Sequence, residues 1–290
     1  MKIITHKIFT KELNLFAFGC VHYGVETHDH DLWITFLKDL HKTPNAIAFG
    51  LGDYTDFART AWRNYLRTWG EEDSFHEAVD KMVIDTLIDP LVKQIKKYCP
   101  SYKEKMMMLI EGNHHYTFNS GKLCGQTSTQ ELCRRLDVPY GGLAAWARIG
   151  VYESKGRCRN LNVLMNHGQS SGSQYITSAL GKMEKQTTSG WRDVDVILSS
   201  HNHMLGHIIT EQIGVTQRGI PKLMDSSMLL AKTGCFKKAY LDGATSSSFE
   251  ERSFFKPHKR GYFRCKAMLK RTGIRRPHEI TRWLFYDFNS

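Results

Sequence analysis

Short apolar runs that end abruptly in glycine and polar residues recur along the chain. Residues 13–19 alternate and then become continuously apolar, which predicts a buried strand. Residues 31–40 carry apolar side chains at helical spacing behind an acidic start, and residues 45–51 form a second short apolar run. This order of strand, helix and strand predicts a βαβ unit.

Helical spacing then replaces this alternation over residues 57–104. An aromatic stripe is predicted on one helix face by four residues at i, i+3, i+4 and i+7, namely Trp62, Tyr65, Leu66 and Trp69. Most such stripes pack in a core, and the alternative is a cap whose aromatic rings stack on substrate bases. A second amphipathic helix is predicted over residues 79–97, closed by Pro100.

The remaining pattern predicts more strands than helices. Strands are expected over residues 105–110, 145–153, 161–165 and 195–199, and helices over residues 126–136 and 175–184. Beyond residue 205 the pattern predicts short strands separated by glycine, proline and charged turns. Since neither an internal repeat nor a clean break in composition is found, we expect one α/β domain over residues 1–290.

Potential metal ligands follow five of the predicted strands, at the point where each strand ends. They are Cys20 and His22, Asp53 and Asp56, Asn113 and His114, His167, and His201 and His203. Because strand ends gather at one edge of an α/β fold, we expect these residues to converge. Imidazole, carboxylate, amide oxygen and thiolate form a ligand set suited to Zn, Fe or Mn. Strand-like geometry would aim both members of a pair such as His201 and His203 to one side, so that one strand end serves two ions.

The ordered series resembles the calcineurin-like metallophosphoesterase superfamily, whose pattern is D-x-H, G-D-x-x-D, G-N-H-[DE], H and G-H-x-H. The matching positions are Cys20-x-His22, residues 52–56, residues 112–115, His167 and residues 200–203. They cover roughly residues 13–207. The resemblance implies a four-layer α/β/β/α sandwich with a dimetal site at one edge, here with a helical insertion near residues 57–104.

The resemblance also implies a role for each residue. The first ion would take Cys20, His22, Asp53 and His203, and the second would take Asp53, Asn113, His167 and His201. Asp53 would bridge the two divalent ions, whose identity (Mn, Zn or Fe) the sequence leaves open. His114 would hold the phosphate or protonate the leaving oxygen, and Asp56 would orient that histidine or another ligand.

The sequence departs from the pattern at three places that matter and at one minor one. Cys20 replaces the first Asp, and a thiolate is softer, which favours Zn or Fe over Mn or Mg. The first site therefore either persists with an altered metal preference or is weakened. His115 stands where many relatives have Glu or Asp, and Phe57-Ala58 replaces the Arg-Gly typical of Ser/Thr phosphoprotein phosphatases, which argues against a phosphoprotein substrate. Ser200 in place of Gly is a small change.

Charge is concentrated near the C-terminus. Residues 231–290 contain 14 Lys and Arg against 5 Asp and Glu, out of a net charge of +11 for all 290 residues. This imbalance predicts a polyanionic partner, with nucleic acid first, or else a solvated basic surface. Lys256, Lys259 and Arg260 lie among aromatic residues and are the candidate substrate-binding residues, since cations track phosphates and rings stack on bases.

These features give three hypotheses for function. The first is a metal-dependent phosphodiesterase acting on nucleic acid, either a nuclease or an end-processing enzyme. The second is hydrolysis of a small phosphodiester, nucleotide or phosphomonoester. The third is a weakly active nucleic-acid-binding protein in which Cys20 impairs the first metal site. The seven cysteines form no C-x-x-C pair, and neither a long apolar run nor a secretory signal is found. We therefore expect a cytoplasmic protein that does not contact a membrane; the sequence is silent on oligomeric state.

Overall fold

The structure is a computed structural model of the 290-residue chain. It describes residues 1–10, 12–57, 73–154, 157–168, 175–188, 191, 193–215, 223–243, 251, 256–272 and 280–287. The predicted aromatic stripe at Trp62, Tyr65, Leu66 and Trp69 lies outside these residues.

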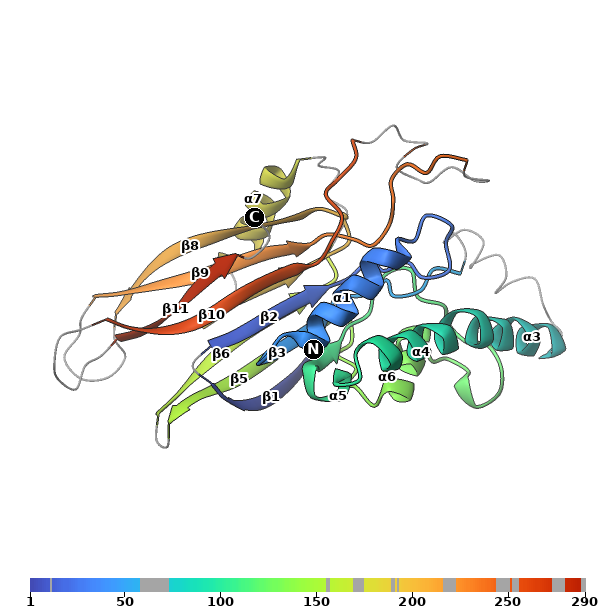
Figure 1. Cartoon of the computed structure of the whole chain (residues 1–290), viewed down its shortest axis with the longest axis horizontal. Helices are drawn as coiled ribbons and strands as arrows, with labels where there is room; N and C mark the ends of the chain where they lie inside the picture. Colours follow the sequence, from blue (N-terminus) through green and yellow to red (C-terminus); the bar gives the residue numbers. More distant parts are fainter. Residues whose placement is uncertain are drawn as a thin grey trace.

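Two β-sheets form the body of the molecule (Figure 1). The six-stranded sheet has the order β1 (Lys2–Phe9), β5 (Ala144–Ser154), β6 (Arg157–Asn166), β7 (Val196–Ser199), β9 (Leu223–Thr233) and β8 (Leu205–Val215). The five-stranded sheet has the order β11 (Ile280–Asp287), β10 (Phe263–Thr272), β2 (Glu12–Phe18), β3 (Ala46–Gly50) and β4 (Met106–Leu109). Strands β2, β3 and β4 are parallel to one another, as are β6, β7 and β9, so their carboxyl ends are at one edge of each sheet.

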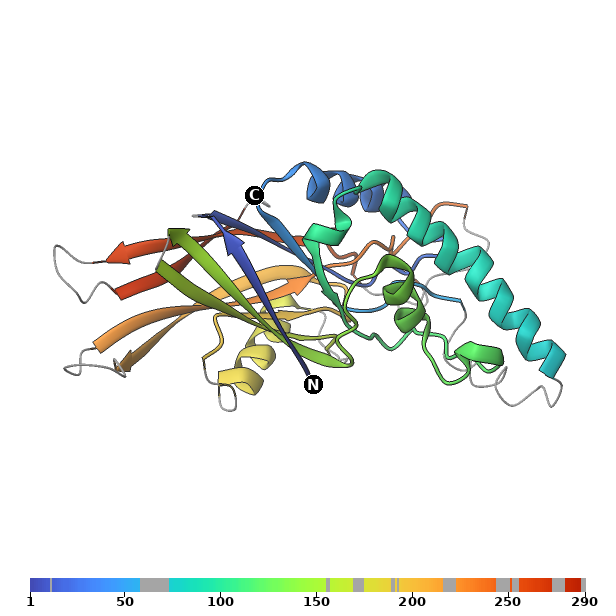
Figure 2. The ribbon, with the colours of Figure 1, turned by 90° about the horizontal axis from the view of Figure 1, so that it is seen from below.

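Helices cover the outer faces of the two sheets (Figures 1 and 2). Beside the five-stranded sheet lie α1 (His30–Lys42), α3 (Asp73–Val83), the π-helical turn η1 (Ile84–Ile88), α4 (Asp89–Tyr98), α5 (Tyr102–Lys105) and α6 (Ser128–Leu136). A short 3-10 turn, η2 (Gly121–Leu123), precedes α6. Helix α7 (Ile176–Thr188) lies on the six-stranded sheet.

The helices and sheets form four layers, with a buried core between each pair of neighbouring layers. Phe16 and Phe18 of β2 pack against Trp33 and Phe36 of α1, in the core between the helices and the five-stranded sheet. The core between the two sheets is lined by residues such as Leu15, Phe49, Val163 and Leu198. The third core joins Ile197 and Leu230 to Leu180 and Met183 of α7. The expected α/β fold with two sheets sandwiched between helices is confirmed.

The helical insertion is also confirmed over the described residues. Helices α3, η1 and α4 run continuously from Asp73 to Tyr98, and the apolar stripe predicted over residues 79–97 is buried. Pro90 follows the π-helical turn at the start of α4, where its missing N–H removes a helical hydrogen bond.

The prediction of short strands beyond residue 205 is wrong. Strands β8 and β9 have 11 residues each and β10 has 10. Strand β10 pairs with β2 in the five-stranded sheet and buries Phe263, Cys265 and Ala267 between the sheets. The alternation of these apolar residues with Arg264 and Lys266 is typical of a strand covered on one face, so part of the basic C-terminal region belongs to the fold. None of the helices in the described ranges combines the length and the apolar character that a bilayer crossing needs.

Candidate metal centre

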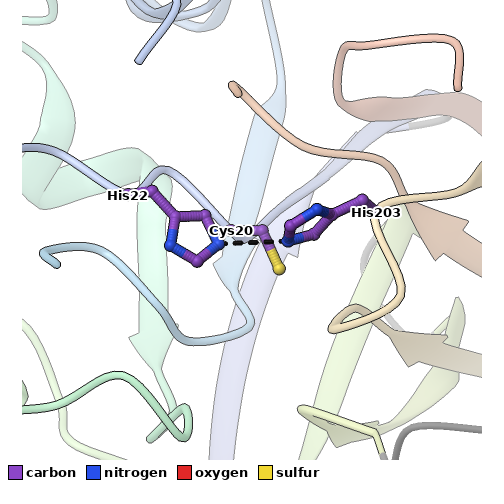
Figure 3. Close-up of side chains that lie close together, drawn as sticks. All are labelled: Cys20, His22 and His203. Atoms are coloured by element: carbon purple, nitrogen blue, oxygen red, sulfur yellow. Dashed lines mark hydrogen bonds between the residues drawn. The ribbon is translucent and has the colours of Figure 1, made fainter. Parts of the chain in front are cut away.

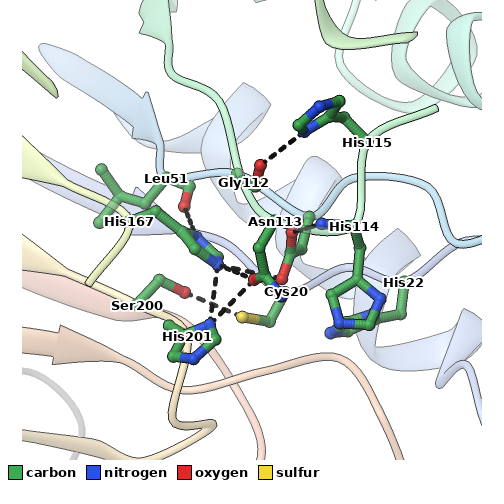
Figure 4. Close-up of polar contacts among 12 residues, drawn as sticks. Cys20, His22, Leu51, Gly112, Asn113, His114, His115, His167, Ser200 and His201 are labelled. Carbon is green, nitrogen blue, oxygen red and sulfur yellow. Dashed lines mark hydrogen bonds and ion pairs between the residues drawn. The ribbon is translucent and has the colours of Figure 1, made fainter. Parts of the chain in front are cut away.

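Loops at the carboxyl ends of five strands bring the predicted ligands together (Figure 4). Cys20 and His22 follow β2, Asp53 and Asp56 follow β3, Asn113 and His114 follow β4, His167 follows β6, and His201 and His203 follow β7. The first three loops leave the five-stranded sheet and the last two leave the six-stranded sheet, so the cluster joins the two sheets at one edge.

The backbone around the cluster is not strand-like. Five of the eight non-glycine residues with positive φ in the described chain are predicted ligands: Cys20, His22, Asp53, His201 and His203, with φ between 50° and 72°. The expectation that strand geometry aims the members of a pair is therefore wrong, since both members lie in left-handed turns beyond the strand. Such conformations cost energy in non-glycine residues and concentrate at functional sites.

Two glycines allow the loops after β3 and β4 to touch. Gly52 has a φ of +92°, and a Cβ there would stand 2.6 Å from the backbone N of Gly112. A Cβ on Gly112 would in turn overlap the carboxylate and backbone N of Asp53. With no side chain between them, the His114 backbone N–H donates to Asp53 Oδ1 at 2.8 Å. The close approach thus fixes the position of Asp53.

Cys20, His22 and His203 form the first of two ligand groups (Figure 3). The Nε2 atoms of His22 and His203 are 3.1 Å apart, and Cys20 Sγ lies within 4.8 Å of both ligand atoms. On the other side of its ring, His22 Nδ1 lies 3.1 Å from Asp56 Oδ2. Nδ1 therefore donates to the carboxylate, and Nε2 offers its lone pair toward His203.

The second ligand group surrounds Nε2 of His167. Asn113 Oδ1 lies 2.8 Å from that nitrogen, Asp53 Oδ2 lies 3.0 Å from it, and His201 Nδ1 lies 3.2 Å from it. The opposite nitrogen, Nδ1, lies 2.5 Å from the carbonyl oxygen of Leu51. The pair that follows β7 is thus divided between the two groups: His201 belongs to this group and His203 to the first.

The arrangement around His167 fits a bound cation. Because the Leu51 carbonyl only accepts, His167 Nδ1 carries the proton of the neutral ring and Nε2 carries a lone pair. That lone pair faces two further acceptors, the oxygens of Asn113 and Asp53. Burial lowers the pKa of His167, but the hydrogen bond and charge of Asp53 outweigh it and raise the pKa. Even a protonated ring supplies one proton at Nε2 for two oxygens, whereas a metal ion accepts all the lone pairs at once.

Distances within the groups also fit coordination. Bonds of about 2.0–2.1 Å to a tetrahedral ion place neighbouring ligand atoms about 3.3 Å apart. The separations of 3.1 Å between His22 and His203 and of 3.2 Å between His167 and His201 are close to that spacing. Cys20 Sγ also forms a candidate group with Asp53 and His167, so the sulfur lies next to both ligand groups.

Electrostatics keep most of these ligands in the form that binds metal. Burial lowers the pKa of His22 to about 4 and that of His201 to about 4, so both rings are neutral at pH 7. Burial would raise the pKa of Asp53, but the hydrogen bond with His167 and the neighbouring rings hold it well below its usual value. Cys20 differs, because burial and the charge of Asp53 raise the pKa of its thiol well above the usual value. Coordination to a metal deprotonates such a thiol outright.

Asp56 joins the cluster to His114. Its Oδ2 atom lies 3.0 Å from His114 Nδ1 and 3.1 Å from His22 Nδ1, so one carboxylate orients both rings. His115 points away from the cluster (Figure 4), and its Nδ1 lies 2.8 Å from the Gly112 carbonyl oxygen. Many members of the resembled family have an acidic residue at this position. Here His115 contacts the backbone of its own loop.

The predicted substrate-binding residues lie on the segment before β10, which Arg260 joins to the loop between β2 and α1. Lys256 and Lys259 are exposed, whereas Arg260 forms an ion pair with Asp29, the residue that caps α1. The backbone N–H of Gly261 donates to the Cys235 carbonyl at 2.9 Å, which anchors the segment. A further basic stretch runs from Lys270-Arg271 to Arg275-Arg276, and its residues from 273 onward lie outside the described residues.

Sequence reasoning missed three residues around Cys20. Ser200 Oγ lies 3.1 Å from Cys20 Sγ, and Thr233 Oγ1 donates to Ser200 Oγ at 3.0 Å. Lys232 is buried, and its Nζ donates to Ser199 Oγ at 2.9 Å. Ser200 lies in the segment 200–203 that matches the family pattern, but its replacement of Gly gave no reason to predict a role. Lys232 and Thr233 belong to no motif of the sequence.

No protein-family model matches the chain, and no curated protein sequence matches it either. Among solved structures, a Vps29 single mutant from Entamoeba histolytica aligns with a TM-score of 0.32 and 10% identity, over 96% of this chain and 100% of that one. Vps29 from Chaetomium thermophilum gives 0.32 and 12%, over 95% and 98%. GAP50 of Plasmodium, described as the anchor in the inner membrane complex, gives 0.36 and 11%, over 96% and 89%. At such scores the function has to be argued from the residues of this chain.

Proposed function

We propose that this chain is a phosphoester hydrolase of the calcineurin-like metallophosphoesterase type, dependent on a dinuclear metal centre. The observation that carries the proposal is the convergence of Asn113 Oδ1, Asp53 Oδ2 and His201 Nδ1 on Nε2 of His167. The group of Cys20, His22 and His203 beside it supports a second ion. Both groups stand at the carboxyl ends of parallel strands, where α/β proteins place their active sites.

Each side chain has a role that its contacts support. When bound, two divalent ions would supply Lewis acidity toward phosphoryl oxygens and a nucleophilic water. Asp53, whose position is fixed by the His114 backbone N–H, would bridge the two ligand groups. His114 would act on the leaving oxygen through Nε2, because its Nδ1 faces Asp56. Asp56 would hold the ring in that orientation and stabilise it when protonated.

A hydrolysis screen tests this proposal. The purified chain, kept reduced and supplied with Mn, Zn, Fe or Ni, is compared on a phosphomonoester, on bis-p-nitrophenyl phosphate and on oligonucleotides. We expect hydrolysis that chelation abolishes and that Asp53→Asn and His114→Gln each reduce by about 100-fold or more. Metal-independent turnover, or wild-type rates in both variants, would contradict the proposal. Binding of well under two ions per chain without hydrolysis would instead favour a weakly active binding protein.

For the substrate we propose phosphodiester bonds in nucleic acid. The exposed Lys256 and Lys259 lie on the segment that Arg260 anchors to the β2–α1 loop, the loop that begins with Cys20 and His22. Basic side chains there would contact phosphates, so affinity should fall with added salt. The double variant Lys256→Ala/Lys259→Ala should weaken oligonucleotide binding and lessen its salt dependence, while hydrolysis of bis-p-nitrophenyl phosphate stays unchanged. Salt-insensitive binding, equal in the wild type and the variant, would contradict this assignment.

A small phosphoester is the second candidate, and specific contacts favour it. Arg260 pairs with Asp29, Arg264 with Asp39, and Lys266 with Glu12. These ion pairs assign part of the basic C-terminal charge to the fold itself, which leaves less of it for a polyanion. Turnover of small phosphoesters by a chain that has no affinity for DNA or RNA would decide for this candidate.

A further inference from the structure

The hydrogen-bonding partners of the Cys20 side chain lie in the loop after β7, where Ser200 is the side-chain partner and His201 a backbone partner (Figure 4). Cys20 Sγ lies 3.1 Å from Ser200 Oγ, and both side chains are buried. Cys20 and Ser200 are two of the positions at which the sequence departs from the pattern it resembles. The two departures contact each other.

Thr233 fixes the direction of this contact. Its hydroxyl donates to Ser200 Oγ at 3.0 Å, and the side chain is fully buried. A serine hydroxyl has one proton, and with a lone pair occupied by Thr233 that proton is directed toward Cys20. A sulfur bound to a metal has no proton to give, so Ser200 must be the donor when the site is loaded.

The backbone around Ser200 leaves room for its hydroxyl group. A Cβ on Gly19 would stand 2.5 Å from Ser200 Oγ, so only glycine at this position accommodates the hydroxyl. The Ser200 backbone N–H donates to the His167 carbonyl at 3.0 Å, which ties the serine to the loop of the second ligand group. Ser200 is thus held at its side chain by Thr233 and at its backbone by His167.

A buried ammonium contacts the two serines that precede His201. Lys232 Nζ donates to Ser199 Oγ at 2.9 Å and contacts the Ser200 carbonyl at 3.4 Å. Within the described ranges its ammonium pairs with no carboxylate. The ammonium thus helps to hold Ser199 and Ser200 in place beside Cys20.

We propose that Ser200, held by Thr233, is a positioning residue that orients Cys20 Sγ as a thiolate ligand and makes the first metal position selective for thiophilic ions such as Zn²⁺ or Co²⁺ over Mn²⁺ and Mg²⁺. The inference rests on the proposed metal centre. A sulfur with the two nitrogens of His22 and His203 is a soft ligand set, whereas the atoms that surround His167 Nε2 at 2.8–3.2 Å are the oxygens of Asn113 and Asp53 and a nitrogen of His201. Hydrogen bonds to a ligand typically set its orientation and basicity, and their loss costs about 10–100-fold in affinity.

Co²⁺ titration of the reduced, metal-free chain tests this inference. Thiolate ligation produces a charge-transfer absorption band in the near ultraviolet, and Cys20→Ser should abolish it. In Ser200→Ala the band should move to longer wavelength, because the sulfur lone pairs lose a stabilising donor. The affinity of one ion should fall by about 10–100-fold while that of the other stays unchanged. Thr233→Val should change both in the same direction, and it carries the test if Ser200→Ala does not fold.

One control variant and three contrary outcomes complete the design. Thr43→Val removes a buried hydroxyl that donates to the Asp39 carbonyl at the end of α1, so it should leave the band and both affinities unchanged. Wild-type bands and affinities in Ser200→Ala and Thr233→Val would overturn the positioning role. A chain that binds two Co²⁺ ions without any Cys20-dependent band would overturn the inference and leave the metal centre standing. A chain that binds no divalent ion would overturn the proposed function as well.

Discussion

Replacing Asp56 by Asn tests how the cluster orients its histidines. One carboxylate oxygen lies 3.1 Å from His22 Nδ1 and 3.0 Å from His114 Nδ1, so the native side chain accepts from two rings. An amide has one acceptor oxygen and no charge, so it serves one ring and presents N–H groups or no partner to the other. Losing one hydrogen bond to a charged group costs about 1.5–3 kcal/mol of stability. Because His22 is a predicted ligand, metal affinity should also fall by about 10–100-fold.

Asp39→Asn is the matched control for this experiment. The Asp39 carboxylate also accepts side-chain donors, Tyr262 Oη at 2.8 Å, Arg264 Nη1 at 3.2 Å and Thr43 Oγ1 at 3.3 Å, and it lies on α1. Urea unfolding of the metal-free proteins should show comparable losses of stability in Asp56→Asn and Asp39→Asn. Competition with a chromophoric chelator should show weakened metal binding in Asp56→Asn alone. Equal metal affinity in the wild type and Asp56→Asn would refute the proposed role of Asp56.

Two further predictions concern pH and the glycine contact. The pKa of His22 is about 4 in the folded protein, below the ordinary 6.5, so the unfolded chain takes up its proton first as pH falls. The metal-free protein should therefore lose about 3 kcal/mol of stability through this residue between about pH 6.5 and 4. Urea unfolding of His22→Gln should show a correspondingly smaller loss, and an equal dependence of stability on pH in the wild type and the variant would contradict the lowered pKa of His22. Gly112→Ala should displace Asp53, cost about 1–3 kcal/mol of stability in thermal unfolding and weaken metal binding. Gly181→Ala, which has open space around it in α7, is the control and should leave stability unchanged or raise it. Unchanged metal binding in Gly112→Ala would contradict the role of the contact between the loops after β3 and β4.

The sequence was most informative where apolar periodicity was strong. Strands β2, β3 and β7 are short apolar runs buried on both faces, and α1 and α4 bury one stripe, so their positions follow from hydrophobic burial alone. The length of the strands after residue 205 is not evident from the sequence, because polar and basic residues interrupt the alternation of apolar and polar positions. Strand β1 was not predicted at all, and it has exposed and partly buried residues only.

The candidate site shows a similar division. That Asn113, His167 and His201 converge could be expected, since each follows an apolar strand, and strand ends meet at a sheet edge. The left-handed backbone at His201 and the contact between Ser200 and Cys20 could not, because both depend on how loops from different sheets meet. Long-range loop contacts of this kind leave no periodic signal in the sequence.

Phosphodiester hydrolysis measured against added metal tests the central claim most directly. The metal-free, reduced chain is titrated with Mn²⁺ or Zn²⁺ at a protein concentration well above the dissociation constants, with bis-p-nitrophenyl phosphate as substrate. The two ligand groups around Asp53 predict that activity rises with added metal and reaches its plateau at two equivalents per chain. The absence of hydrolysis at any metal concentration, or a rate that does not depend on added metal, would contradict it.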